Sequence, residues 1–262
     1  TETKKKDLAL IAKQDAALPK GATDPKFTLP AIEKSKLSNG LNVWVVQHHE
    51  LPIVSMNLVV DGGASAEDPT KSGAASMAAS MLNQGTKSRT ALQISNELQS
   101  IGASVGANAN WDSSNVSLTT LTKNLPQALS IYTDVIANAA FPQGDFDTMK
   151  RRMMGNFLQR KADSQSIANR AFNKVVYGGQ LYGRELGGSE ESIKGLTRDD
   201  LAAFYSANYK PNNATLIVVG DVTLASVKPQ LEKAFAGWKA GQVNAVKVAD
   251  QKMSAEPGIY LV

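Results

Sequence analysis

The sequence of 262 residues contains no cysteine and only two histidines. Without cysteine the chain can form neither a disulfide nor a thiolate metal site. The two imidazoles are adjacent, at His48 and His49. Neighbouring side chains of a strand point to opposite faces, so this pair cannot easily chelate one ion. We interpret His48-His49-Glu50 as a loop at a strand end, with a metal role as the alternative.

Long apolar runs are also missing. None approaches the ~18 residues that span a bilayer, so no membrane span is predicted. The opening Thr-Glu-Thr-Lys-Lys-Lys is not followed by an apolar signal core. An initiator Met is absent too, so we expect the chain to be cut from something longer.

Excess positive charge is confined to the beginning of the chain. Residues 1–40 hold eight lysines against five acidic residues, while the net charge of the whole chain is +4. The remaining sequence is therefore close to neutral, whereas a nucleic-acid-binding protein needs a basic face. We expect no nucleic-acid partner.

Motifs of two common enzyme classes are not found. Ser113, Ser114 and Ser164 lack the Gly-x-Ser-x-Gly elbow of a serine nucleophile. Gly102 and Gly106 flank strand-like sequence with no helix after it, so the dinucleotide fingerprint fails as well.

What the sequence does contain is a series of clear strand and helix signals. Asn39-Gly40 predicts a hairpin, and Thr90 and Thr197 are suited to cap helices. Strands are predicted over 34–37, 41–47, 53–60, 104–111, 115–122 and 215–219. Helices are predicted over 72–83, 90–101, 125–139, 145–161, 165–176, 197–207 and 224–235.

Runs of strands and runs of helices, without strict alternation, predict an α+β fold: an antiparallel-rich mixed sheet with helices packed on one side. Residues 1–29 are polar and Pro-containing, which indicates a leader or inter-domain linker. Residues 30–256 form the predicted domain. Residues 257–262 begin an apolar strand that we assign to a following, absent domain.

The helix predicted over 72–83 has an unusual face. Ser76, Ala79 and Ser80 lie at i, i+3 and i+4, where an inverted zinc-binding helix carries His, Glu and His. On spacing alone, they form a small-residue face that packs against a sheet. The flanks of Gly73–Thr86, with an opening Gly and later Met-Leu and Gly-Thr, nevertheless resemble the metal helix of the pitrilysin and insulinase class of zinc metallopeptidases.

The resemblance covers nearly all of 33–262, because further segments occur in the order of that family. These segments are Leu37–Leu41 with Leu51-Pro52, Tyr177-Gly178, Tyr182-Gly183, Gly188–Ile193, Tyr209–Asn213 and Val218–Val222. The resemblance implies an α+β unit of a processing-peptidase-like half. Two such halves enclose a chamber in which unfolded peptides are cut, and often only one half keeps its metal.

The resemblance also assigns an abandoned site. Ser76 and Ser80 stand in place of the two zinc histidines, and Ala79 in place of the general-base Glu. The third ligand falls on Asn156, with Gly155 as the neighbouring register, and a supporting acid falls on Met149. Hydroxyl and amide groups are poor zinc ligands, and no base remains to deprotonate a metal-bound water. We expect no catalytic, metal or cofactor-binding residue in this chain.

The functional expectation is a non-catalytic domain that pairs with a zinc-bearing homologous half, in the same polypeptide or a separate subunit. Zinc is expected in that half, an extended peptide as substrate, and the bacterial periplasm or cell envelope as location. Alternatives are an active metallopeptidase with a rewired site and a purely structural core-type subunit. The basic run Lys150–Arg152, with Arg160 and Lys161, is interpreted as a solvated face, or alternatively as a partner contact or peptide-attracting wall.

Overall fold

The structure is a computed structural model that describes residues 28–178 and 180–243. The chain divides into two units, residues 1–30 and residues 31–262. Of the first unit only residues 28–30 are described, and they are exposed. The predicted leader over 1–29 lies almost wholly outside the described residues, and the predicted strand over 257–262 lies entirely outside them. Both boundaries stay predictions.

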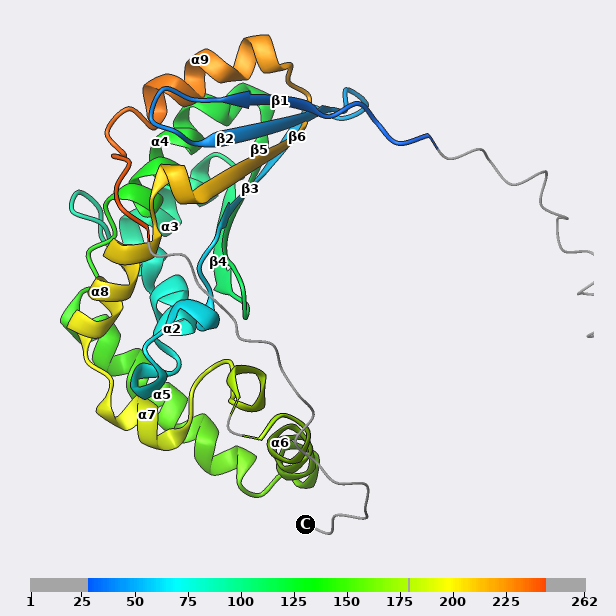
Figure 1. Ribbon diagram of the computed structural model, residues 1–262. Coiled ribbons are helices and arrows are strands. Elements are labelled where there is room, and N and C mark those ends of the chain that lie inside the picture. The colour runs from blue at the N-terminus through cyan, green and yellow to red at the C-terminus, as the bar shows by residue number, and fades with distance from the viewer. Residues whose placement is uncertain (1–27, 179, 244–262) are drawn as a thin grey trace, which may run out of the picture. The chain divides into compact units, whose positions relative to one another are not determined.

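Six strands form one mixed sheet in the second unit (Figure 1). β2 and β6 run parallel, and the other neighbouring pairs are antiparallel. The predicted α+β class with an antiparallel-rich sheet is confirmed. In spatial order the strands are β1 (Glu33–Lys36), β2 (Asn42–Gln47), β6 (Ala214–Gly220), β3 (Ile53–Val60), β5 (Ser114–Leu121) and β4 (Ser104–Ala109).

Helices cover one face of this sheet, with α3, α4 and α9 on the same side (Figure 1). Val43 and Val45 of β2 are buried beneath them, whereas Trp44 between them is exposed on the other face, as strand alternation requires. No helix of the described residues is long and apolar enough to cross a membrane. The described helices are α2 (Ala74–Met81), α3 (Ala91–Ser100), α4 (Leu125–Ala137), α5 (Gln143–Arg160), α6 (Ser164–Tyr177), α7 (Glu190–Gly195), α8 (Arg198–Asn208) and α9 (Leu224–Ala234).

Local signals place the helix starts. Thr90 and Thr197 form capping boxes, accepting from the backbone N–H groups of Gln93 and Asp200, so both predicted caps are confirmed. α7 has no counterpart among the predicted helices, because its six residues are too few to show apolar periodicity. It begins at a capping box of its own, in which Ser189 accepts from the backbone of Ser192.

The central strand β6 ends at Gly220, where any side chain would force the neighbouring backbone of β3 to move. Gly220 has a φ of +139°, and a Cβ added there would lie 2.1 Å from the carbonyl oxygen of Ile53. The backbones of β6 and β3 therefore approach more closely than a side chain permits. This contact explains the glycine in the Val218–Val222 segment.

Tyr132 of α4 joins the helical layer to the sheet. Its buried hydroxyl donates to the carbonyl oxygen of Val116 (2.6 Å) and accepts from the backbone N–H of Leu58 (3.2 Å). Leu58 and Val116 are opposite one another in the β3–β5 register, so the hydroxyl binds both strands at one point. Burial raises the pKa of Tyr132, which keeps the hydroxyl protonated as a donor.

We expect Tyr132→Phe to lower the free energy of unfolding by about 1–3 kcal/mol, because two buried backbone groups lose their partner. Urea denaturation measures the change. Tyr182→Phe is the matched control, since the Tyr182 hydroxyl bonds only to the exposed carboxylate of Asp112 (3.2 Å) among the recorded contacts. Equal losses in the two variants would contradict the bridging role of Tyr132.

Candidate functional site

The helix α2 carries the first three positions of the predicted site. Ser76 is partly accessible, Ser80 is exposed, and Ala79 is buried with 1% of its surface exposed. The Ser80 hydroxyl donates to the carbonyl oxygen of Ser76 (2.9 Å), within the helix itself. The structure thus places two small polar residues on the accessible side of α2 and the third position against the core.

The remaining positions lie on α5, which packs against α2. Asn156 and Gly155 are both exposed, while Met149 is half-buried and packs against the core. The Arg152 guanidinium lies 2.9 Å from the Met149 sulfur. The two helices on which the predicted site depends therefore do meet, and the side chains at its α5 positions are an amide and a thioether.

A carboxylate that the sequence reasoning missed holds the start of α2. Glu67 accepts from the backbone N–H of Ala75 (2.6 Å) and of Gly73 (3.1 Å). Gly73 is the N-cap residue and has no side chain to cap the helix, so Glu67 supplies the acceptor that unpaired N-terminal N–H groups need. Capping signals are local, and Glu67 precedes the helix by too many residues to be found by them.

Gly73 also allows α7 and the loop before it to pack closely on the start of α2. Its φ is +97°, and an added Cβ would lie 2.7 Å from Ile193 of α7 and 2.9 Å from the carbonyl oxygen of Gly187. The loop before α7 and α7 itself therefore pack directly on the start of α2. This contact accounts for the glycine that opens the Gly73–Thr86 frame.

The donor set at α2 and α5 does not fit zinc. Zinc sites in proteins use imidazole, thiolate or carboxylate ligands, and positions 76, 80 and 156 carry two hydroxyls and one amide. Glu67, the acid at the start of α2, already accepts two backbone hydrogen bonds. Across residues 28–178 and 180–243, no three His, Asp or Glu side chains come together as a metal cluster.

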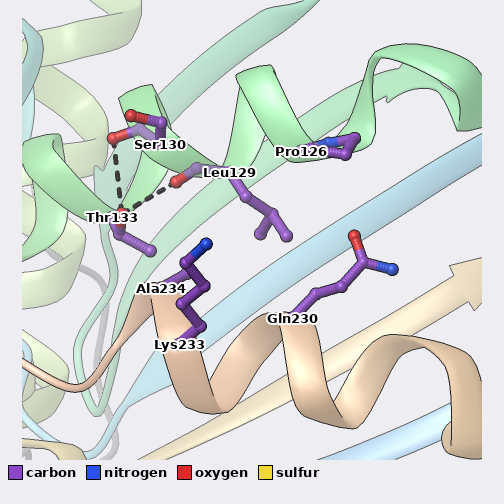
Figure 2. Close-up of a pocket in the computed structure, with 7 residues that line it drawn as sticks. All are labelled: Pro126, Leu129, Ser130, Thr133, Gln230, Lys233 and Ala234. Atoms are coloured by element: carbon purple, nitrogen blue, oxygen red, sulfur yellow. Dashed lines mark hydrogen bonds between the residues drawn. The ribbon is translucent and has the colours of Figure 1, made fainter.

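Two other places in the described residues gather polar side chains. One is a hollow of about 510 Å³ between α4 and α9, in which Lys233 is the only titratable residue among those lining it; Figure 2 shows these residues. There the Thr133 hydroxyl donates to carbonyl oxygens of its own helix (2.8 and 3.3 Å), so the hollow offers no acid–base pair. The second place is the histidine loop after β2, where His49 contacts Asp221 (2.8 Å) and His48 lies 3.9 Å from Glu50. The two imidazoles engage different partners.

Comparison with known proteins decides what this frame is. Residues 42–189 match the family model "Insulinase (Peptidase family M16)", and residues 195–259 match "Peptidase M16 inactive domain". The chain belongs to peptidase family M16. The pitrilysin and insulinase resemblance is thereby confirmed, and the second match is to an inactive-type domain of the family.

Two curated relatives illustrate the family. An uncharacterized zinc protease of Rickettsia bellii is 26% identical over 208 residues, covering 79% of this chain and 50% of the relative. The beta subunit of the mitochondrial-processing peptidase of Dictyostelium discoideum is 26% identical over 226 residues, covering 84% and 48%. The chain spans about half the length of these relatives.

Solved structures agree with the M16 fold. A peptidase M16 inactive domain from Pseudomonas fluorescens superposes with a TM-score of 0.79 at 24% identity, covering 85% of this chain and 54% of that one. The periplasmic protease PqqL from Escherichia coli gives a TM-score of 0.77 at 21% identity, covering 86% and 26%. These likenesses establish the architecture.

The Glu67 carboxylate makes the stability of this M16 domain pH-dependent. Burial raises the pKa of Glu67 from 4.5 to about 7, against the opposing effect of the Ala75 and Gly73 N–H groups and the charge of Arg184. Because the pKa of Glu67 is higher in the folded state, its protonation stabilises the fold. This contribution to the free energy of unfolding is complete below about pH 4.5 and is lost as the pH rises through about 7.

We therefore expect the wild type to lose up to about 3 kcal/mol of unfolding free energy through this group between about pH 4.5 and pH 8. Glu67→Gln should lack that loss. Urea unfolding of both proteins across this range measures it, and Glu191→Gln, at an exposed position of α7, controls for removal of one negative charge. Parallel pH profiles of wild type and Glu67→Gln would refute the expectation.

Proposed function

We propose that this chain is a non-catalytic unit of an M16 zinc peptidase and pairs with a zinc-bearing homologous half. The observation that carries the proposal is the donor set at the family's metal helix: the frame of α2 is kept, while Ser76, Ala79, Ser80, Asn156 and Met149 take the positions of the catalytic groups. A helix packed for a metal site, with every ligand replaced, supports a role without metal chemistry.

The partner follows from the relatives. They are zinc proteases and a processing-peptidase subunit, and each is about twice the length that this chain matches. A unit without ligands contributes to peptide cleavage only when another unit supplies the zinc. The zinc-bearing half is either part of the same polypeptide or a separate subunit.

The substrate that suits this arrangement is an extended peptide. Among the described strands, β4 lies at one edge of the sheet and pairs only with β5. Its sequence, Ser-Val-Gly-Ala-Asn-Ala, has no large side chain. An edge strand can bind a peptide through backbone hydrogen bonds, which tolerate many sequences. We place the protein in the bacterial periplasm or cell envelope, in line with its structural likeness to the periplasmic PqqL.

We expect the purified chain alone to retain no stoichiometric zinc after dialysis and to cleave no unfolded peptide. Mixing with a family member from the same source that carries an intact His-x-x-Glu-His helix should raise the cleavage rate of that member at least about tenfold, a barrier change of ~1.4 kcal/mol. Metal analysis and a fluorogenic peptide assay measure both. Tight zinc in the isolated chain, with cleavage that a chelator abolishes, would instead establish a rewired active site.

The assignment of the abandoned positions has a test of its own. Ser76→His/Ser80→His/Asn156→Glu restores three ligands, and we expect it to bind zinc at least about tenfold more tightly than a two-histidine helix. Ser95→His/Gln99→His is the matched control, because Ser95 and Gln99 are exposed one turn apart on α3. Competition with a chromophoric chelator measures the zinc affinities. Equal affinities in the two variants would contradict the assignment of residue 156 to the site.

A further inference from the structure

The end of α5 and the whole of α6 form a stretch without a buried residue. Phe157 is only 2% exposed, but from Leu158 to Gly178 every residue is half-buried or exposed. In α4, by contrast, nine of 13 residues are buried. Burial of apolar side chains is the main force that holds an element in a fold. Residues 158–178, which we call the α6 arm, must therefore be held mainly by other contacts.

One carboxylate contacts the α6 arm at two points. Glu185, which follows the arm in the chain, pairs with Arg160 in the last turn of α5 (3.4 Å) and with Arg170 in the middle of α6 (2.7 Å). The side chains of Arg160 and Arg170 are 41% and 43% exposed, and that of Glu185 is 26% exposed. Ion pairs at such exposed positions contribute little to stability, and salt screens them.

The remaining attachments of the arm are of the same kind or are local in the chain. Lys161 pairs with Glu190 of α7 (2.5 Å) at the surface. The Tyr177 ring lies 6.4 Å from that of Tyr182, and among the described elements α6 contacts chiefly the turn η5 (Leu181–Gly183). Figure 1 shows α6 apart from the sheet. These contacts can be lost together while the core stays folded, because none of them involves a buried side chain of the arm.

Both ends of α6 lie at places where the chain can change direction. Residues 161–163 form the turn between α5 and α6, and Asp163 caps α6 by accepting from the backbone N–H of Ser166 (2.8 Å). At the other end, the C-cap residue Gly178 has a φ of +58°, a conformation that glycine adopts without strain. Hinges in proteins are a few loop or element-terminal residues of this sort.

We propose that the α6 arm is a hinged element that opens as a unit while the core stays folded, and that the carboxylate of Glu185 holds it closed. Opening separates Glu185 from Arg160 and Arg170 at once. Because this hold is electrostatic, the ionic strength sets the balance between the closed and the open arm. The inference is independent of the proposed function, since all the contacts that carry it lie within this chain.

Hydrogen exchange of the full chain, followed by mass spectrometry, tests whether the arm opens. The backbone amides of α6 should show protection factors at least about a hundredfold lower than those of α4, because local opening needs far less free energy than global unfolding. Raising NaCl from about 0.05 M to about 0.5 M should lower the protection of α6 about threefold or more and leave α4 unchanged. Equal protection of α6 and α4 would refute the opening.

A single variant tests the role of Glu185. Glu185→Gln keeps the size of the side chain and removes its charge, so at low salt α6 should lose protection about threefold or more. The effect of added salt on α6 should largely disappear in this variant, because the pairs that salt screens are gone.

Glu97→Gln is the matched control. Glu97 lies on α3, and its carboxylate pairs with Arg89 (3.0 Å) at 40% exposure, so the change removes one charge and one ion pair outside the arm. It should leave the exchange of α6 and its salt dependence as in the wild type. A Tm within about 2 °C of the wild type verifies that both variants fold.

The remaining outcomes also decide the proposal. If α6 exchanges rapidly but neither salt nor Glu185→Gln changes its rate, Glu185 does not hold the arm. If the protection is lost only in the first and last turns of α6, the helix frays from its ends and does not open as a unit. If Glu97→Gln accelerates α6 as much as Glu185→Gln does, the effect belongs to the net charge of the protein. Each of these three results would overturn the proposal.

Discussion

The insertion of β6 between β2 and β3 is the constraint on which the rest of this structure depends. β6 comes more than 150 positions after both neighbours, pairs parallel with β2 and antiparallel with β3, and approaches β3 so closely at Gly220 that no side chain fits. It belongs to the segment that matches the inactive-domain model, whereas its two neighbours belong to the segment that matches the insulinase model. The two matched segments therefore share one sheet. Neither can bury its apolar strand faces alone, because removal of β6 would open a gap in the middle of the core.

The packing of α2 on this core explains why its position does not depend on the residues at 76 and 80. The buried side of α2 consists of alanines and methionines packed on the core, including Ala75, Ala78 and Met77, and its start is held by Glu67 and Gly73. Ser76 and Ser80 lie on the accessible side, where an exchange between Ser and His removes no core contact. The packing that holds α2 in place and the two positions predicted to have lost ligands therefore lie on different sides of the same helix.

The sequence predicts the features that depend on interactions between residues close together in the chain, and it misses those that depend on distant residues. Asn39-Gly40, Thr90 and Thr197 act within a few residues, and each of the elements they predicted is present. The parallel pairing of β2 with β6 and the capping of α2 by Glu67 join residues that no local pattern relates. α7 was missed because one and a half turns carry no periodicity. At the candidate site, residues 76, 79, 80, 149 and 156 were predicted only through the family frame, and their assignment stays a prediction. The burial of Ala79 and the exposure of Asn156 required the fold.

α5 carries two of the predicted site positions, Met149 and Asn156, and packs against both α2 and α7. α5 packs against α7 along much of its length. Lys150 in its middle donates to the carbonyl oxygens of Lys194 and Leu196 (2.8 and 2.7 Å), and Lys161 at its C-cap pairs with Glu190 (2.5 Å). Asn156 and Leu158 are exposed. The exposed and buried positions of α5 are therefore constrained by different things. Phe146 and Phe157 are buried in the core, so packing limits their size, whereas Arg151, Asn156 and Leu158 are exposed and can be exchanged at little cost to the fold.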